Sequence, residues 1–161
     1  MSEENNIHGK SLARLIAVQG LYSHEISGGS EDVEDLLERL VHVQVDKEDE
    51  DDSIMQNPDR KLLRELIVDC TKNKKDIDGI ITKYLKPGWG ISRLDVLLLS
   101  IIRPAIYELK EKKKTPVKVI FDEYVNIAHS FYDLQEVGFV NGILDSVAHE
   151  LRPEEMTSKN G

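Results

Sequence analysis

The sequence predicts an all-α protein, a compact bundle of six to seven helices. Apolar residues recur at spacings of three and four along successive segments, which is the pattern of helices with one buried face. No segment shows the strict alternation of apolar and polar residues that is typical of a half-buried strand. Short groups of glycine, proline and capping residues separate the segments, so consecutive helices are expected to pack against one another.

The first helix is predicted over residues 10–26. Its apolar face comprises Leu12, Leu15, Ile16, Tyr22 and Ile26. Gly28-Gly29 is expected to end this helix, because glycine readily adopts the left-handed conformation that follows a helix. Ser30 is a suitable cap for a second helix, whose apolar stripe lies within residues 33–41.

A third helix is predicted from Asn57-Pro58-Asp59 to about residue 84. A capping side chain followed directly by proline is typical of a helix start. The apolar pattern indicates an interruption near Asn73, and Lys86-Pro87-Gly88 is expected to end the helix. Trp89 follows in a short connector, where we expect it to be a core anchor.

Residues 94–109 are expected to form the central helix. The most apolar stretch, VLLLSII, contains one polar residue, Ser100, and a helix that is apolar on almost every side must be surrounded by other helices. Ser92 is the expected N-cap, with Asp95 three residues later. Pro104 removes a backbone donor and crowds the Ser100 carbonyl, so we expect a kink there.

Two more helices complete the bundle. Thr115-Pro116 is expected to start one of them by the same cap and proline pattern. Its apolar face comprises Val117, Ile120, Phe121, Tyr124, Ala128 and Phe131. The last helix is predicted over residues 139–151, with Phe139 at its start and Arg152-Pro153 after its end.

A single all-helical domain is therefore predicted over residues 9–153. Residues 1–8 are expected to be a disordered tail, and residues 154–161 a polar tail. Residues 46–56 are expected to form an acidic insertion loop, because this segment has no apolar periodicity. No stretch is apolar enough to span a bilayer, and the first ten residues lack the hydrophobic run of a signal peptide, so a cytoplasmic protein is expected.

The formal net charge of −9 is concentrated in one segment. Residues 31–52 contain eleven acidic and two basic side chains, and the rest of the chain contains nineteen of each sign. The overall acidity is therefore only a weak argument against RNA binding, because the charge of one face decides whether RNA can bind.

The sequence contains no pattern of catalytic or metal-binding residues. The five histidines lie on different segments without the spacing of a helical zinc site, and no phosphate-binding glycine loop is present. The single cysteine, Cys70, excludes an intramolecular disulfide and is expected to fill a core position. We therefore expect a protein that is not an enzyme and that needs neither a metal nor another cofactor.

Several polar and aromatic residues are candidates for an RNA-binding site. Lys10 and Arg14 lie one helical turn apart, so both could reach one phosphate track. Gln19 lies on the apolar stripe of the first helix, where it must be hydrogen-bonded if it is buried. Phe139 and Asn141 supply an aromatic ring and an amide, the groups that stack on and hydrogen-bond to an unstacked base. Each of these residues alone is more often structural.

Five blocks of the sequence resemble the signature blocks of the NusB family, in the family's order. They read ARLIAVQGLYS (13–23), W-x-x-x-R-L (89–94), IIRPAIYEL (101–109), PVKVIFDEYVNIAHSF (116–131) and FVNGILD (139–145). The resemblance implies a NusB-like, all-helical fold with two subdomains and a function in transcription antitermination. It also adds Tyr22 to the candidate RNA-binding residues, since Tyr22 and Phe139 match aromatic positions of the family blocks.

The resemblance also implies partners. Members of the family bind single-stranded boxA RNA of ribosomal RNA leaders together with NusE, a small-subunit ribosomal protein, and act in the antitermination complex of RNA polymerase. This chain departs from the family at the start of the first helix, where only Lys10 and Arg14 keep the charge of an arginine-rich segment. The alternative is therefore a helical adaptor that binds NusE-like proteins without RNA. A homodimer that hides the RNA-binding face is left open by the sequence.

Overall fold

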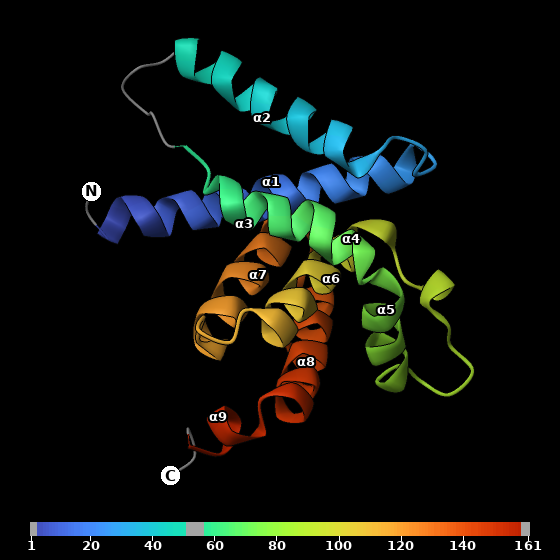
Figure 1. Ribbon diagram of the computed structural model, residues 1–161. Helices are drawn as coiled ribbons and strands as arrows, with labels where there is room; N and C mark the ends of the chain where they lie inside the picture. Colours follow the sequence, from blue (N-terminus) through green and yellow to red (C-terminus); the bar gives the residue numbers. More distant parts are fainter. Residues whose placement is uncertain (1–2, 51–56, 159–161) are drawn as a thin grey trace. The chain divides into compact units, whose positions relative to one another are not determined.

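The computed structural model describes residues 3–50 and 57–158, and every regular element in this part of the chain is a helix (Figure 1). The prediction of an all-α fold is therefore confirmed. The chain divides into two compact units, Met1–Lys72 and Asn73–Gly161, in line with the two subdomains that the resemblance implies. They are called unit 1 and unit 2, and each is described by itself.

Unit 1 begins with two helices joined by a glycine turn, α1 (Glu3–Ile26) and α2 (Val33–Glu50). Gly28 and Gly29 end α1 as predicted, with φ angles of 97° and 70°. The Gly28 N–H donates to the Glu25 carbonyl and the Gly29 N–H donates to the His24 carbonyl. These two bonds form a Schellman motif, which satisfies carbonyls at the end of the helix.

Both helices are longer than the sequence predicts. α1 begins at Glu3, so residues 3–8 are helical where we expect a tail. α2 reaches Glu50, so residues 46–50 are helical where we expect the acidic loop, and residues 51–56 of that loop lie outside the described residues. Neither segment contains proline or glycine, and glutamate and lysine favour helices, so each helix continues beyond its apolar stripe.

The second half of unit 1 consists of the short helix α3 (Arg60–Arg64), a π-helical turn η2 (Glu65–Asp69) and α4 (Cys70–Lys72). Asp59 caps α3 in place of the predicted Asn57, since its Oδ1 accepts from the Leu62 N–H at 2.9 Å. The unit's core is formed by residues from α1, α2, α3, η2 and α4, namely Ala13, Ile16, Ala17, Leu36, Leu62, Leu63, Leu66, Ile67 and Cys70.

Two glycines let α1 pack closely against its neighbours. A Cβ on Gly9 would lie 3.1 Å from the Asn57 carbonyl oxygen, and the Gly9 carbonyl accepts from the Asp59 N–H at 2.8 Å. A Cβ on Gly20 would lie 2.6 Å from Cδ1 of Leu40 on α2. A side chain at either position would push the neighbouring segment away from α1.

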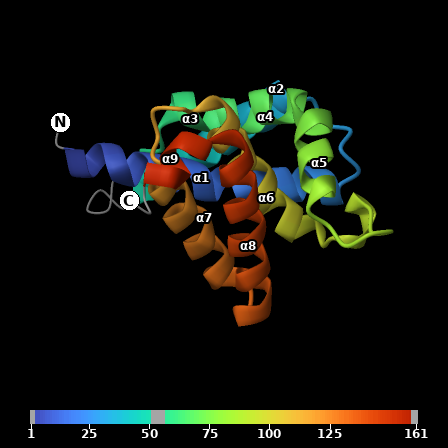
Figure 2. The same ribbon diagram turned by 90° about the horizontal axis from the view of Figure 1, so that it is seen from below.

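Unit 2 is built around α6 (Val96–Glu111), whose residues from Leu98 to Leu109 are all buried. It packs against α5 (Lys74–Lys83), α7 (Val117–Phe131) and α8 (Leu134–Leu151), as Figures 1 and 2 show. The remaining elements are the short 3₁₀ helix η3 (Ile91–Arg93) and the last helix α9 (Pro153–Ser158). The prediction of a central helix is confirmed, and α5 begins after Asn73, where the interruption is predicted.

Several predicted boundaries in unit 2 are wrong. Asp95 precedes α6 as its cap residue, whereas Ser92 lies in η3. Pro116 takes the cap position of α7 in place of Thr115. α8 begins at Leu134, five residues before Phe139. Residues 153–158 form α9 where a tail is expected, and residues 159–161 lie outside the described part of the chain.

Two expectations concern single residues. α6 continues on both sides of Pro104, so the proline does not end the helix, and the kink remains a prediction. Trp89 exposes 40% of its surface, so the expectation that it anchors the core is wrong. Its backbone lies in a turn at the edge of unit 2, where too few neighbours surround the ring to bury it.

Arg152 joins three helices at one end of unit 2. It exposes 6% of its surface, and its guanidinium donates to four carbonyls, those of Glu108, Leu109, Lys112 and Thr115, at 2.6–3.1 Å. It also pairs with Glu155 at 3.1 Å, and the other carboxylate oxygen of Glu155 accepts from the Val117 N–H at 2.7 Å. The pair of Arg152 and Glu155 therefore satisfies the last carbonyls of α6 and the first turn of α7.

A second polar contact joins α5 to α8. The Tyr84 hydroxyl donates to Glu150 at 2.5 Å, and the Lys83 ammonium pairs with the same carboxylate at 3.2 Å. The hydrogen bonds from Tyr84 and Lys83 hold the pKa of the Glu150 carboxyl below its ordinary value, and the bond to Glu150 raises the pKa of the Tyr84 hydroxyl. Both shifts favour the bonded pair at neutral pH.

Candidate nucleic-acid interface

Lys10 and Arg14, the two predicted phosphate contacts, have different environments on α1. Lys10 is exposed to solvent, in the turn that Gly9 holds against residues 57–59. Arg14 exposes 2% of its surface and is already engaged within the protein. Lys10 can therefore meet a phosphate directly, whereas Arg14 would first have to leave its present partners.

Gln19 and Tyr22 lie three residues apart on α1 and are neighbours on its surface. Both are exposed, so Gln19 is not a buried amide. Gln19 follows Lys10 by about two and a half helical turns, which places the two residues on opposite sides of the helix. α1 thus brings Gln19 and Tyr22 together and separates Gln19 from Lys10.

Phe139 and Asn141 lie in α8 of unit 2. Phe139 is half-buried, and Asn141 is exposed. Because α8 begins at Leu134, Phe139 lies in its second turn and does not open the helix. Residues two apart on a helix point to different sides, so the ring and the amide do not face each other directly.

An open strip of helix surface lies between Phe139 and Asn141. Gly138 and Gly142 are one turn apart on α8, and a Cβ at either glycine would meet no atom within 4 Å. The helical repeat places Phe139 on one side of this strip and Asn141 on the other. A flat group could therefore approach the backbone of α8 with an aromatic ring and an amide beside it.

The charge of the two units is very different. Unit 1 contains seventeen acidic and eight basic residues, and unit 2 contains thirteen of each sign. The chain's whole net charge of −9 therefore lies in unit 1. A polyanion that contacts α1 would need local cations such as Lys10, whereas unit 2 as a whole does not repel it.

The sequence interpretation missed an aromatic and cationic group in unit 2. The Lys86 ammonium and the Arg93 guanidinium lie over the exposed Trp89 ring, each 5.5 Å from the ring centre. The signal in the sequence was a tryptophan with a basic residue three or four positions away on either side. The same pattern also fits a core tryptophan, because the sequence does not show the exposure of the ring.

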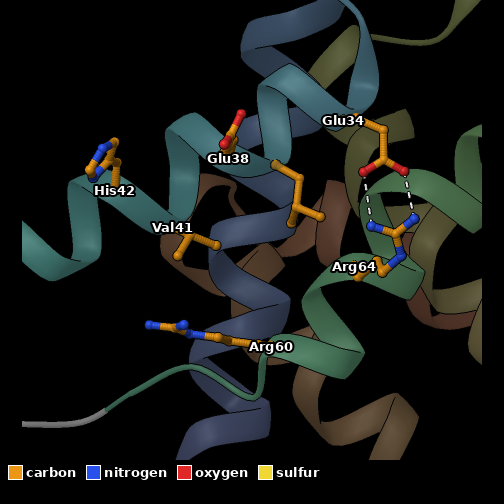
Figure 3. A pocket seen from close by; sticks show the side chains of 7 residues that line it. Glu34, Glu38, Val41, His42, Arg60 and Arg64 are labelled. Atoms are coloured by element: carbon orange, nitrogen blue, oxygen red, sulfur yellow. Dashed lines mark hydrogen bonds and ion pairs between the residues drawn. The ribbon is translucent and has the colours of Figure 1, made fainter.

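A groove of about 700 Å³ lies between α2 and α3 in unit 1 (Figure 3). Its side chains carry both signs of charge, and Glu34 and Arg64 point at each other in a bidentate ion pair of 2.5 and 2.8 Å. The lining residues are Glu34, Leu37, Glu38, Val41, His42, Arg60 and Arg64. None of the six predicted RNA-binding residues is among them, and the mixed charge does not suit a phosphate.

No three histidine, cysteine, aspartate or glutamate side chains in the described part of the chain lie close enough to hold a metal ion together. Among the described helices, none combines the length and the apolar character that crossing a membrane requires.

The chain was compared with known proteins. The model of the NusB family matches residues 11–149. Transcription antitermination protein NusB of Rhodopseudomonas palustris is 30% identical over 154 residues, which cover 96% of this chain and 87% of the relative. The protein of the same name from Caulobacter vibrioides is 34% identical over 148 residues, which cover 92% of this chain and 97% of the relative.

A solved structure supports the same assignment. NusB of T. maritima superposes with a TM-score of 0.74 at 30% identity, and the match covers 91% of this chain and 96% of that one. The family match spans most of the sequence, and the relatives are matched over nearly their full length. The chain therefore belongs to the NusB family of transcription antitermination factors.

Proposed function

We propose that this chain is a non-catalytic RNA-binding factor, which binds a boxA-type single-stranded RNA together with NusE during transcription of ribosomal RNA. The observation that carries the proposal is the open strip of α8, where Phe139 and Asn141 flank the backbone at Gly138 and Gly142. Membership of the family supports the further partners in this proposal, NusE and the antitermination complex of RNA polymerase, and with them a cytoplasmic location.

The surface of α8 suits an unstacked base. Phe139 offers part of its ring for stacking, and the exposed Asn141 amide can both donate to and accept from a base edge. Without side chains at Gly138 and Gly142, the base can lie close to the helix. Single-stranded RNA presents such bases, whereas a duplex keeps them stacked and paired.

The exposed residues of α1 supply the remaining contacts in this proposal. Lys10 binds a phosphate. Gln19 and Tyr22, which are neighbours of each other on another side of the helix, bind a base or ribose. Arg14 is buried and already engaged within the protein, so it contributes to RNA binding through its charge unless the complex releases it. With few phosphate contacts, binding depends on NusE, because a joint surface adds contacts to the same RNA.

The test is the affinity of a fluorescein-labelled boxA-type RNA, measured by anisotropy with and without NusE. Gly142→Gln should weaken RNA binding by filling the strip, while leaving the free energy of unfolding unchanged or higher, because Gln favours helices more than Gly. Gly79→Gln is the matched control, since Gly79 is also an exposed helical glycine with no atom near its Cβ. Equal RNA affinity for the two variants would contradict a role of the α8 strip.

Lys10→Ala tests the phosphate contact. The slope of log affinity against log salt should fall by about 0.7, the value for one contact on single-stranded RNA. Lys61→Ala, which removes an exposed lysine from α3 of the same unit, should leave the slope unchanged. Binding to NusE with no RNA signal at low salt would reject the proposal and favour the adaptor that binds protein alone.

A further inference from the structure

The connector between α5 and α6 carries an aromatic platform that the proposed function does not use. Trp89 is the only tryptophan of the chain, and it exposes 40% of its surface. The Lys86 ammonium and the Arg93 guanidinium both lie 5.5 Å from its ring centre, within range of a cation–π contact. The connector thus presents one large ring and two positive charges to solvent.

The backbone of the connector holds these groups in place. The Trp89 N–H donates to the Lys86 carbonyl at 2.9 Å, with Pro87 and Gly88 between them. Gly88 has a φ of 84°, so proline and a left-handed glycine occupy the two central positions, the pattern of a type II turn. This turn keeps Lys86 next to Trp89 in the free protein.

The 3₁₀ helix η3 positions the second cation. The Arg93 N–H donates to the Gly90 carbonyl at 3.0 Å, and the Leu94 N–H donates to the Ile91 carbonyl at 2.9 Å. η3 also packs against α5, which ties this end of the connector to the body of unit 2. The backbone of the platform is therefore formed before binding, and a ligand that stacked on the ring would need only the side chain of Lys86 or Arg93 to move off it.

The charge around the ring favours an anionic ligand. Residues 79–94 contain three basic residues and no acidic one, and the first of the three, Lys83, is paired with Glu150. Within the described part of the chain, Lys86 and Arg93 form no ion pair, and both are exposed. A purely structural cation–π contact would not require two unneutralised cations beside an exposed indole.

We propose that this platform is a second contact site for single-stranded RNA, in which Trp89 stacks on an unpaired base while Lys86 and Arg93 bind the adjacent phosphates. An acidic peptide could neutralise the two cations, but nucleic acid supplies both the regularly spaced anions and the flat face that an indole stacks on. The site rests on the proposed function, because it binds the same RNA, and it adds a contact in unit 2 outside the six residues of that proposal.

The single tryptophan makes the site directly observable. The intact protein is titrated with the boxA-type RNA, and the fluorescence of Trp89 is excited where tyrosine does not absorb. Stacking on a base should quench this fluorescence, whereas an oligoglutamate peptide of the same length should not. Anisotropy of the labelled RNA, read on the same samples, reports binding at any site.

The two readouts separate the two proposals. RNA binding by anisotropy with unchanged Trp89 fluorescence would overturn the platform and leave the proposed function standing. No RNA binding by anisotropy at low salt would overturn both. Quenching by oligoglutamate or by NusE, without quenching by RNA, would show a protein-docking face and would also overturn the platform.

Variants test the roles of the individual residues. The double variant Lys86→Ala/Arg93→Ala should lower the slope of log affinity against log salt by about 1.4, the sum for two phosphate contacts. The charge-matched control is Lys75→Ala/Lys118→Ala, which removes two exposed lysines from the same unit and should leave the slope unchanged. Trp89→Ala should weaken RNA binding at least about 5-fold, the lower end of the range for one stacked base.

Trp89→Phe separates stacking from structural damage. Phenylalanine keeps a stacking face, so Trp89→Phe should recover part of the affinity that Trp89→Ala loses. If the phenylalanine and alanine variants bind RNA equally well, and both match the parent protein, the ring takes no part in RNA binding. Circular dichroism of each variant confirms that the helices remain.

Discussion

Replacing Arg152 by alanine should destabilise unit 2 more than any surface substitution. The guanidinium is buried and makes five hydrogen bonds, so alanine leaves several groups without a donor. These are the carbonyls of Leu109 and Thr115 and one carboxylate oxygen of Glu155, whereas the carbonyls of Glu108 and Lys112 keep the N–H groups of Lys112 and Thr115 as donors. The Leu109 carbonyl lies in the last turn of α6, where carbonyls lack the intrahelical donors of the helix interior.

The magnitude follows from the burial of these groups. Each buried polar group that loses its partner costs about 1–3 kcal/mol, but water entering the cavity satisfies some of them, so the costs do not add. The Glu155 side chain exposes 33% of its surface, so Arg152→Ala should cost less than the loss of one partner from a fully buried ion pair, and we expect about 2–3 kcal/mol. That is a large part of the total stability of a small protein, which is about 5–15 kcal/mol.

The measurement is urea-induced unfolding followed by far-ultraviolet circular dichroism. Arg152→Lys keeps the charge but lacks the planar fork of donors, so its stability should lie between those of the parent protein and Arg152→Ala. Lys113→Ala is the control, because Lys113 is an exposed cation with one hydrogen bond to the Leu151 carbonyl. A loss below about 1 kcal/mol for Arg152→Ala would refute the reasoning, since it would mean that the carbonyls are satisfied without the guanidinium.

Two further predictions concern contacts between helices. Because the Glu150 pKa lies below its ordinary value of 4.5, the bond from Tyr84 stabilises the fold above that pH and is lost as the pH falls through the shifted pKa. Glu150→Gln should therefore lower the free energy of unfolding by no more than about 1 kcal/mol at pH 7, and by less at pH 4. Urea unfolding at both pH values measures the two losses. Equal losses at the two pH values would exclude the ionised carboxylate as the source of the stabilisation. In unit 1, a Cβ at Gly20 would lie 2.6 Å from Cδ1 of Leu40. Gly20→Ala should therefore raise the free energy of unfolding more in a Leu40→Ala background than in the parent chain. Strictly additive effects in a double-mutant cycle would contradict this contact.

The sequence predicted the buried faces of the helices better than their ends. Apolar spacing identified α6 as the central helix and located the interruption at Asn73. It missed the N-terminal extension of α1 to Glu3 and the continuation of α2 to Glu50, because those turns have no apolar face. Their helical state depends on the propensity of polar residues, which periodicity does not measure. The sequence does not indicate the π-helical turn η2, because one turn with i→i+5 hydrogen bonds leaves the spacing of apolar residues almost unchanged.

The candidate site could be predicted only as a set of residue types. The sequence placed Lys10 and Arg14 one turn apart, but burial, which depends on tertiary packing, separates an exposed lysine from a buried arginine. It also took Trp89 for a core residue, because a large aromatic ring is usually buried. The open strip at Gly138 and Gly142 could not be foreseen, since a helical glycine may equally mark a close contact, as Gly20 does.

The contacts of Arg152 and Glu155 also bear on how the protein is made. The Leu109 and Thr115 carbonyls and the Val117 N–H bond to the side chains of Arg152 and Glu155, which the ribosome adds about forty residues later. In unit 1 the corresponding distant contacts, Gly9 with Asp59 and Glu34 with Arg64, are available once residue 64 has been added. We therefore expect unit 1 to fold during synthesis, while unit 2 completes its fold only after Glu155 has left the exit tunnel.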